Sequence, residues 1–434
     1  MNDVVGVVLA GGIGKRFWPL TGPKPLVDFL GKSLLVHNLE ALKSAGIRRV
    51  LIVVPATEPE FVLPNIAGLQ SEIVRQTRPL GMADAYLAAA EKLSSQACLV
   101  LNATDVVEDS FYKTLRGRLS ENQMFIVGKA VSEYTDVGYL RLDGNKVTGI
   151  VEKPGKGKEP SRYVNFVFDY FPDPAAFTEL VKATKSAQDD VYEKALTKLL
   201  QRQPATLMTY SGFWQPLKYP WQILDILDYF LKQKLAEHRG KNVEIKDNVF
   251  IDGPVWLGDN VKILENTKIV GPCYIGANTV IGNNNVIRYS QIGENCVTGF
   301  NTDITRSFVG PNSWFHSNYV GDSVLEGNVG LGSGTVLANL RLDEGEIFSL
   351  VQGKRLGSGR NKLGAVIGRD TRIGVNTSIM PGVKIGGKSL VGAGLVIDKD
   401  IPDNSFCLGK TDYKTEKNVS SVSRKNREEF RLKL

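Results

Sequence analysis

The sequence predicts an α/β domain with a doubly wound parallel sheet, followed by a β-solenoid. Two observations support this prediction. In the first half of the chain, short apolar runs alternate with segments that have helical apolar spacing. In the second half, apolar residues recur every six residues, a period that matches neither a helix nor a hairpin. A chain of 434 residues is also too long for one typical core, so two or more domains are expected.

The α/β prediction for the first half depends on five segments. Residues 4–10, 50–54 and 98–103 are short apolar runs, which indicate buried strands. Residues 33–46 and 82–93 have the apolar spacing of helices. Strands that alternate with helices form a parallel sheet, in which ligands bind at the carboxyl ends of the strands.

Two ladders of apolar residues, each with a spacing of six, define the second half. A coil of three short strands, each with one apolar side chain pointing inward, has this period. The ladders consist of Ile245, Ile251, Leu257, Ile263, Ile269, Ile275, Ile281 and Ile287, and then of Ile367, Ile373, Ile379, Ile385, Val391 and Ile397.

The places where these patterns stop predict the domain boundaries. Residues 231–242 are expected to form a helix that runs into the linker. The polar, glycine-rich residues 340–364 interrupt the second ladder and are expected to loop out. The chain after Asp398 is charged and irregular, as in a tail. We therefore expect an α/β domain over 1–238, a solenoid over 239–400 and a tail over 401–434.

Composition narrows the class of protein. A net charge of +7, with 42% hydrophobic and 23% charged residues, is ordinary for a soluble protein and suits an anionic small-molecule substrate. No block of Lys and Arg is interleaved with aromatic residues, so no nucleic-acid partner is expected. The four cysteines are scattered without a CxxC motif, which favours a reducing compartment. Because no apolar run approaches ~20 residues, we expect no membrane partner and a cytoplasmic location.

The stretch LAGGIGKRFWPLTGPKPL, residues 9–26, follows the first predicted strand. It fits neither the P-loop spacing GxxxxGK[ST] nor the dinucleotide pattern GxGxxG. Its glycines would let backbone N–H groups approach a triphosphate closely. Arg16 and Lys24 add positive charges that could stabilise a phosphoryl-transfer transition state.

This stretch resembles the signature of the sugar-1-phosphate nucleotidylyltransferases, and further motifs follow in the order of that family. They are QTRPLGMADA (76–85), LNATDVV (101–107), VGYLRLDGNKVTGIVEKP (137–154) and RYVNFVFDYF (162–171). The resemblance covers about residues 4–235. It implies that the triphosphate contacts the start of the glycine-rich stretch, at Leu9, Ala10, Gly11 and Gly12. It also implies that Gln76 and the Gly81 backbone bind a pyrimidine base and that Asp105 binds Mg²⁺. The sugar would contact Gly138, Glu152, Lys153 and Asn165.

The reaction implied by the resemblance is attack of a sugar 1-phosphate on the α-phosphorus of a nucleoside triphosphate, with Arg16 and Lys24 as the catalytic cations. The expected substrates are UTP and N-acetylglucosamine 1-phosphate. The chain departs from the family at Pro216, in GFWQPLKYPWQILDIL, where an Asp often supplies a second magnesium ligand. Asp105 is therefore the single carboxylate expected at the metal.

A segment of the solenoid, HSNYVGDSVLEGNVGLGSGTVLANLRLD (316–343), resembles the left-handed β-helix acetyltransferases. The order of the two parts resembles the archaeal-type bifunctional enzymes. The resemblance implies that His316 is a general base, a role that suits an unperturbed pKa near 6.5. It also implies that Tyr319 and Asn339 position substrates, that Lys362 meets a phosphate, that acetyl-CoA is a co-substrate and that the chain forms a homotrimer. Gly330 stands in place of a family Asn.

Two alternatives remain open from sequence. The chain could be a monofunctional glucose-1-phosphate uridylyl- or thymidylyltransferase whose β-helix serves only for oligomerisation. It could also be a non-catalytic subunit that binds a nucleotide sugar, which the change at Pro216 permits. A zinc carbonic anhydrase is excluded because the chain has only three histidines, of which His37 and His238 are expected in helices of the first half.

Overall fold

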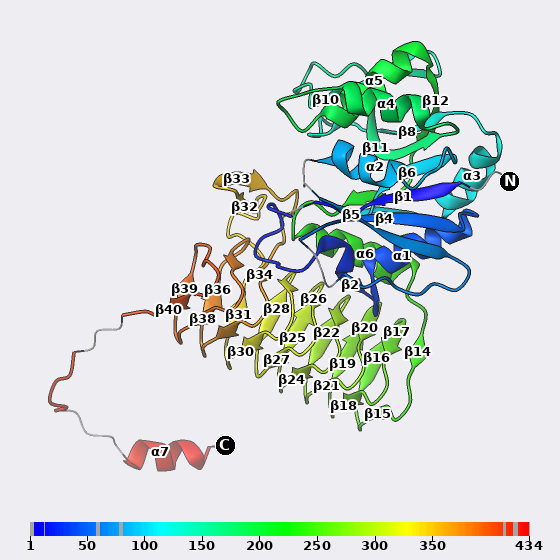
Figure 1. Ribbon diagram of the computed structural model, residues 1–434. Helices are drawn as coiled ribbons and strands as arrows, with labels where there is room; N and C mark the ends of the chain where they lie inside the picture. The colour runs from blue at the N-terminus through cyan, green and yellow to red at the C-terminus, as the bar shows by residue number, and fades with distance from the viewer. Residues whose placement is uncertain are drawn as a thin grey trace.

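The computed structural model describes residues 4–12, 14–57, 61–77, 81–410, 414–419 and 424–433. Figure 1 shows an α/β domain resting on one side of a long β-helix, with the C-terminal helix α7 (Arg424–Arg431) lying away from both. This is the predicted order of architectures, and the fold class is confirmed.

The α/β domain is built on a nine-stranded sheet in the order β5-β4-β1-β6-β11-β8-β12-β10-β9. The first four strands in this order are parallel, whereas β11 runs antiparallel to both β6 and β8. The fully buried β1 lies between β4 and β6, so the glycine-rich stretch leaves the middle of the sheet. The strands are β1 Val5–Leu9, β4 Arg49–Pro55, β5 Gln70–Gln76, β6 Cys98–Asn102, β8 Phe125–Ala130, β9 Gly138–Asp143, β10 Lys146–Glu152, β11 Tyr163–Phe171 and β12 Ala205–Tyr210.

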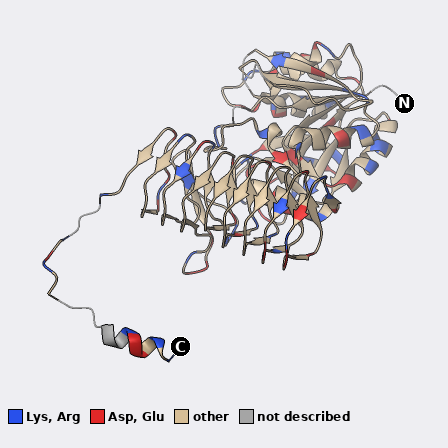
Figure 2. Ribbon diagram, turned by 90° about the horizontal axis from the view of Figure 1, so that it is seen from below, with Lys and Arg blue, Asp and Glu red and all other residues tan. Residues whose placement is uncertain are grey.

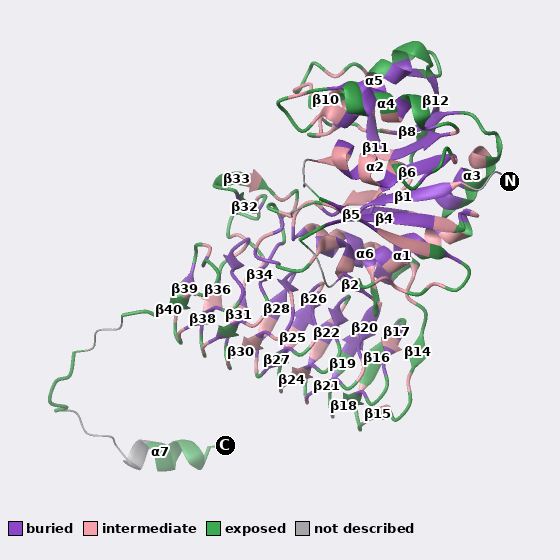
Figure 3. Ribbon diagram, viewed as in Figure 1, coloured by how far each residue is buried: buried purple, intermediate pink, exposed green. Residues whose placement is uncertain are grey.

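Helices cover the sheet, and Figure 3 shows its central strands as buried. The helices are α1 Leu34–Ser44, α2 Met82–Ala90, α3 Asp109–Ser120, α4 Ala175–Ala183, α5 Val191–Arg202 and α6 Gln222–Gln233. Short elements lie near the carboxyl ends of the parallel strands or connect to the β-helix. They are η1 Lys24–Leu26, β2 Asp28–Phe29, β3 Lys32–Ser33, β7 Asp105–Val107 and β13 Trp214–Pro216.

The helix expected over residues 231–242 is wrong beyond Gln233, where α6 ends. His238 and Arg239 form β14, which pairs in parallel with β17 of the β-helix. The ring of His238 stacks on that of Trp256, with centroids 4.9 Å apart. Pairing with the first coil thus satisfies backbone groups that a longer helix would have satisfied internally, and His238 lies in a strand and not in a helix.

The β-helix is left-handed and consists of three parallel sheets, one along each of its sides. The first contains β14 His238–Arg239, β17 Val255–Leu257, β20 Cys273–Ile275, β23 Gln291–Ile292, β26 Phe308–Val309, β29 Val324–Leu325, β34 Val366–Ile367 and β37 Lys384–Ile385. The second contains β15 Glu244–Ile245, β18 Lys262–Ile263, β21 Val280–Ile281, β24 Val297–Thr298, β27 Trp314–Phe315, β30 Gly330–Leu331, β35 Arg372–Ile373, β38 Leu390–Val391 and β40 Phe406–Cys407. The third contains β16 Phe250–Asp252, β19 Lys268–Val270, β22 Val286–Arg288, β25 Asp303–Thr305, β28 Tyr319–Gly321, β31 Val336–Leu337, β36 Ser378–Ile379 and β39 Val396–Ile397.

Most residues of the isoleucine ladders line the interior of the β-helix, as predicted, whereas Ile251 in the first coil is 37% exposed. Ile263, Ile269, Ile275 and Ile281 are completely buried in one core cluster. At one corner, Asn242, Asn260, Asn278 and Asn295 adopt left-handed backbone conformations, which Asn tolerates better than most residues. Their side-chain amides form a ladder in which Nδ2 of each donates to Oδ1 of the next, at 2.9–3.2 Å.

The interruption of the ladder at residues 340–364 is an ordered excursion. It contains the hairpin of β32 (Phe348–Val351) and β33 (Lys354–Gly357). The excursion leaves the β-helix as predicted, and most of its residues, including the hairpin turn at 352–355, are exposed. Ile347, Val351 and Leu363 are buried in a cluster that includes Phe17 and Leu20 of the α/β domain, so part of the excursion packs at the contact between the domains. Strand pairing also continues past residue 400, because β40 pairs with β38.

Figure 2 shows basic and acidic residues interspersed over the helices of the α/β domain, while most of the β-helix strands are uncharged. Among the described residues, no helix has the length and apolarity needed to cross a bilayer.

Candidate active sites

The glycine-rich stretch turns sharply after β1, and its backbone lies against Gln76. A Cβ atom at Gly11 would come within 2.5 Å of Gln76 Oε1, so a side chain at this position would displace the Gln76 amide. Gly14 has a φ of +67°, which favours glycine. Residue 13 lies outside the described residues. The stretch is therefore shaped for close approach between backbone and ligand.

Gln76, at the end of β5, is 2% exposed and has a defined orientation. Its Nε2 donates to the Gly81 carbonyl at 3.2 Å and to Asp84 Oδ2 at 2.9 Å. Both amide hydrogens are thereby used, which leaves Oε1 as an acceptor. Residues 78–80 of the predicted base-binding segment lie outside the described residues.

Asp105, at the start of β7, is a buried carboxylate held by neighbouring side chains. Trp214 Nε1 donates to its Oδ2 at 3.0 Å, and Pro216 is its register partner in β13. Burial raises the pKa of Asp105 to about 6, against the opposing effects of hydrogen bonds from Trp214 and Asn102 and of the nearby charge on Lys218.

Asp105 fits a role as a ligand of a divalent cation. Among the described residues, no group of three or more His, Cys, Asp and Glu side chains could enclose a metal. Mg²⁺ commonly binds one or two carboxylates together with substrate phosphates and water. A single buried carboxylate in the same cavity as the glycine-rich turn matches that chemistry.

The residues predicted to contact the sugar meet at the paired ends of β9 and β10. Gly138 lies directly opposite Glu152 in the antiparallel register. A Cβ at Gly138 would come within 3.0 Å of Glu152 Oε2, so the glycine makes room for this carboxylate. Lys153 Nζ pairs with Glu152 Oε1 at 3.0 Å. Asn165, 9% exposed, lies at an irregularity of β11, where its Oδ1 accepts from the Val167 amide at 2.9 Å.

One cavity of about 380 Å³ joins these groups. Of the residues predicted from sequence, its wall includes Leu9, Gly11, Gly12, Arg16, Gln76, Gly81, Asp105, Gly138, Glu152, Lys153 and Asn165. Ala10 and Lys24 instead line a smaller adjoining cavity under the glycine-rich stretch.

Lys24 does not line the main cavity, but its side chain contacts Lys218, which does. Its Nζ donates to the Lys218 carbonyl at 3.1 Å and lies 5.2 Å from the centre of the Phe17 ring. Burial, with the nearby charges of Arg16 and Lys218, lowers the pKa of Lys24 to about 8. The three cations therefore form a positive site that an anion would stabilise.

Sequence reasoning missed several residues of this cavity. Asn102, Trp214 and Lys218 surround Asp105, and Asp84 orients Gln76. Glu193 also lines the cavity, and burial raises its pKa to about 7. The sequence offers one indication of Trp214 and Lys218: they lie two residues before and after Pro216, in the segment GFWQPLKYPWQILDIL.

Two of the predicted acetyl-transfer residues, Tyr319 and Asn339, belong to a polar network beside β28. Tyr319 Oη donates to Asn339 Oδ1 at 3.3 Å, and Asn339 Nδ2 donates to Asp322 Oδ2 at 2.5 Å. Arg306 makes two hydrogen bonds to Asp322, at 2.8 and 2.7 Å. Gly321 permits this arrangement, since a Cβ there would lie 2.6 Å from Asn339 Nδ2.

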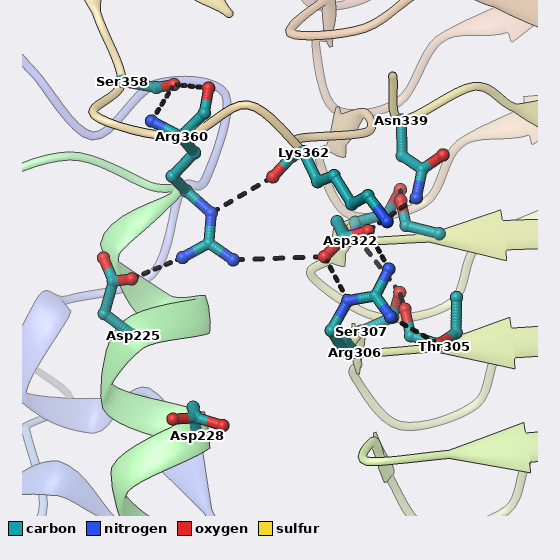
Figure 4. Close-up of polar contacts among 12 residues, drawn as sticks. Asp225, Asp228, Thr305, Arg306, Ser307, Asp322, Asn339, Ser358, Arg360 and Lys362 are labelled. Atoms are coloured by element: carbon teal, nitrogen blue, oxygen red, sulfur yellow. Dashed lines mark hydrogen bonds and ion pairs between the residues drawn. The ribbon is translucent and has the colours of Figure 1, made fainter. Parts of the chain in front are cut away.

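Figure 4 shows a second arginine on the other side of Asp322. Arg360, in the excursion, lies 4.0 Å from Asp322 Oδ1 and is paired with Asp225 of α6. Its Nε donates to the backbone carbonyl of Lys362 at 3.2 Å. The network around Asp322 was not predicted from sequence, and it connects the β-helix to the α/β domain.

His316 and Lys362 are both exposed. The backbone of His316 is fixed, because its N–H donates to Asn318 Oδ1 at 2.8 Å and its carbonyl accepts from Thr302 Oγ1 at 2.9 Å. Within the described residues, no hydrogen bond or ion pair joins its imidazole to another side chain. The backbone of Lys362 pairs with Leu340 across the base of the excursion.

The departure at Gly330 has a structural counterpart in Arg372. These two residues are register partners in β30 and β35. A Cβ at Gly330 would come within 2.7 Å of Arg372 Cδ. Arg372 Nη2 donates to Asn328 Oδ1 at 2.8 Å. The arginine stem thus occupies the space that a side chain at residue 330 would need.

Replacing Asp105 should change how stability depends on pH. The folded pKa of Asp105 lies above the unfolded value of 3.8, so its contribution to stability is largest below about pH 4 and is lost as pH rises through 6. Asp105→Asn removes this titration. In metal-free buffer we expect the variant to gain stability relative to wild type between pH 4 and 7, by about 3 kcal/mol at most, since one pKa unit is worth about 1.4 kcal/mol.

Thermal unfolding at several pH values would measure this difference. Asp398→Asn, at an exposed position, is the control and should show little change across the same range. A difference between Asp105→Asn and wild type that stays constant from pH 4 to 7 would contradict the raised pKa of the buried carboxylate.

Comparison with known protein families agrees with the two-part architecture. The nucleotidyl transferase family matches residues 5–217. Bacterial transferase hexapeptide repeats match residues 254–289, and the hexapeptide repeat of succinyl-transferase matches residues 364–399. Among solved structures, UDP-glucose pyrophosphorylase from Acinetobacter baumanii aligns with 54% of this chain and 95% of that chain, with 19% identity and a TM-score of 0.48.

Curated relatives match nearly the whole chain. The bifunctional sugar-1-phosphate nucleotidylyltransferase/acetyltransferase of Sulfurisphaera tokodaii is 33% identical over 92% of this chain and 98% of its own length. Bifunctional protein GlmU of Methanocaldococcus jannaschii is 31% identical over 92% of this chain and 96% of its own length. With both domains and their order shared at this identity, the chain belongs to the family of bifunctional sugar-1-phosphate nucleotidylyltransferases with a C-terminal hexapeptide-repeat acetyltransferase domain.

Proposed function

We propose that the α/β domain transfers a uridylyl group from UTP to N-acetylglucosamine 1-phosphate and releases pyrophosphate. We further propose that the β-helix acetylates glucosamine 1-phosphate with acetyl-CoA. The observation that most supports the first activity is the single cavity lined by the glycine-rich turn, Gln76, Asp105 and the Gly138–Glu152 pair. These groups match a phosphate chain, a base, a metal and a sugar, in one continuous space.

The fixed amide of Gln76 favours uracil or thymine as the base. Its nitrogen donates to Gly81 and Asp84, so its Oε1 is the atom left to meet a ligand. An acceptor at this place suits the N3–H group of uracil or thymine and not the unprotonated N3 of cytosine. The Gly81 backbone would complete the contact with the base.

The chemistry needs positioning and neutralisation of charge. An oxygen of the sugar 1-phosphate forms a bond to the α-phosphorus, the bond from that phosphorus to the bridging oxygen breaks, and pyrophosphate leaves. Arg16, Lys24 and Lys153 would offset the negative charge on the phosphates, while Glu152 and Asn165 orient the sugar. Leu9, Ala10, Gly11 and Gly12 would supply the backbone surface that follows the triphosphate.

Asp105 would hold Mg²⁺ together with phosphate oxygens. The ion would add its two positive charges to those of the three cationic side chains at the phosphates. Trp214 and Asn102 keep the carboxylate in place by hydrogen bonding, and Pro216 contributes no ligand.

For acetyl transfer, the amine of glucosamine 1-phosphate forms a bond to the thioester carbonyl of acetyl-CoA, the carbon–sulfur bond breaks and coenzyme A leaves. His316 would accept the proton from the amine and return it to the departing sulfur. Tyr319 and Asn339, joined by a hydrogen bond, would orient the substrates, and Lys362 would bind a phosphate. We also propose a cytoplasmic homotrimer, with acetyl-CoA bound between β-helices whose exposed apolar side chains include Trp314 and Leu390.

The first experiment measures both reactions on one preparation. Protein with Mg²⁺ and UTP is given N-acetylglucosamine 1-phosphate or glucose 1-phosphate, and pyrophosphate is followed. A second assay supplies glucosamine 1-phosphate with acetyl-CoA and records free thiol. We expect pyrophosphate with the acetamido sugar, and thiol release that falls at least a hundredfold in His316→Ala while pyrophosphate release is unchanged.

Other results would select one of the alternatives. Pyrophosphate without thiol release would indicate a monofunctional nucleotidylyltransferase with a structural β-helix. A preference for glucose 1-phosphate would revise the sugar. No product in either assay, across several sugars and triphosphates, would leave a protein that binds nucleotide sugars without catalysis.

The decrease of kcat/KM at alkaline pH should reflect loss of the proton from Lys24. Because the pKa of Lys24 is lowered to about 8, its ammonium group loses its proton as pH rises through 8. We expect kcat/KM for the triphosphate to fall above pH 8, since this ratio follows ionisation of the free enzyme. Lys24→Arg stays charged and should move the decline to higher pH.

Lys218→Arg is the matched comparison for this measurement, because burial lowers the pKa of Lys218 as well. If the decline shifts in Lys218→Arg and not in Lys24→Arg, Lys218 controls the alkaline limb. If neither variant shifts it, the titrating group belongs elsewhere and the role given to Lys24 is wrong.

A further inference from the structure

The segment between the two catalytic cations is held by the β-helix. Residues 17–22 run from just after Arg16 to just before Lys24. Phe17 and Leu20 are buried in a cluster with Val324 and Val366 of the β-helix. This segment therefore depends for its conformation on residues some 300 positions further along the chain.

The most specific contact is made by the carboxylate of Glu326, which follows β29. Its Oε1 accepts from the Thr21 amide at 2.8 Å, from Thr21 Oγ1 at 3.0 Å and from the Gly22 amide at 3.0 Å. Its Oε2 accepts from the amide of Arg369 in the next coil, at 2.9 Å. Thus Oε1 binds the loop and Oε2 binds the β-helix.

Further contacts hold the segment on either side of this point. Trp18 Nε1 donates to Asp403 Oδ2 at 2.9 Å, and the ammonium of the buried Lys384 lies 5.2 Å from the centre of the Trp18 ring. Beyond Lys24, Gln291 accepts from the Leu30 amide and donates to the Asp28 carbonyl, both at 2.9 Å. The β-helix therefore binds the chain both before and after Lys24.

We propose that Glu326 is a positioning residue for nucleotidyl transfer, which places the loop that bears Arg16 and Lys24 against the phosphates. This proposal rests on the nucleotidyl transfer proposed above. Hydrogen bonds to an ionised carboxylate are stronger than neutral ones, and this carboxylate binds two successive backbone amides. Displacing catalytic cations by about 1 Å can cost about a hundredfold in rate, so a fixed loop matters to the chemistry. The β-helix would then contribute to the reaction of the other domain.

The test uses the full-length chain with Glu326→Ala, Glu326→Gln and a matched control. Glu326→Ala removes the acceptor for all three donors of the loop, whereas the Glu326 backbone amide still bonds to the Ile367 carbonyl. Glu326→Gln keeps one carbonyl acceptor and should restore part of the activity. Asp370→Asn is the control, because Asp370 accepts from Asn328 inside the β-helix and makes none of the loop contacts described above.

We expect Glu326→Ala to lower kcat for pyrophosphate release at least tenfold, with a smaller change in KM for the triphosphate. Thiol release from acetyl-CoA and the thermal midpoint should stay close to wild type, because the Asp322 network precedes β29 and Glu326 follows it. Thr21→Val removes only the hydroxyl and should have a smaller effect. Combined with Glu326→Ala it should add nothing, since both changes remove the same contact.

Two outcomes would overturn the proposal. Glu326→Ala with kcat within twofold of wild type would show that the loop keeps its place without the carboxylate. Equal losses in both activities, together with a lower thermal midpoint, would show that Glu326 only stabilises the fold. A wild-type protein that releases no pyrophosphate would instead refute the proposed nucleotidyl transfer, and this inference with it.

Discussion

The side chain of Phe29 packs between the two domains, in the same buried cluster as Phe17 and Leu20 of the loop between Arg16 and Lys24. Phe29 is completely buried, with its ring centre 5.3 Å from that of Phe230 on α6 and 5.8 Å from that of Phe308 on β26. Since one ring packs on a helix of the first domain and on a strand of the second, the domains cannot separate without exposing it to water. The segment that presents Phe29 to this interface also contains Arg16 and Lys24.

Packing of this segment between the domains also keeps buried and like charges close together around the main cavity. Lys24 lies near Arg16 and Lys218, and its pKa is lowered as a result. Asp105 is a buried carboxyl with a raised pKa. Charges in such positions destabilise the unliganded protein, and a flexible loop would move them toward solvent. Packing against the β-helix opposes that movement, so the cations on the loop keep their places without a bound ligand.

The predictions of Gly138, Glu152 and Asp105 as site residues rest on the resemblance of their motifs to a family, and the fold brings the three residues to one cavity. Gly138 and Glu152 meet because antiparallel pairing puts them opposite each other, and Asp105 follows directly after the strand next to β1. Asp84 and Asn102 could not be recognised, because they are ordinary polar residues whose importance comes from the side chains beside them. The helix expected beyond Gln233 failed for a related reason, since only the partner strand β17 shows that the chain there forms a strand.

The excursion at residues 340–364 shows why periodicity alone cannot describe the β-helix. Its Arg360 pairs with Asp225, which is 135 residues earlier in the chain, and lies 4.0 Å from Asp322. The side chain of Asp322 is 1% exposed, and a carboxylate so buried requires compensating charges. Arg306 supplies one from the β-helix, and Arg360 supplies another only while the excursion is held against α6. Different contacts between the two domains therefore fix the loop that bears Arg16 and Lys24 and bring Arg360 near Asp322, which binds Asn339.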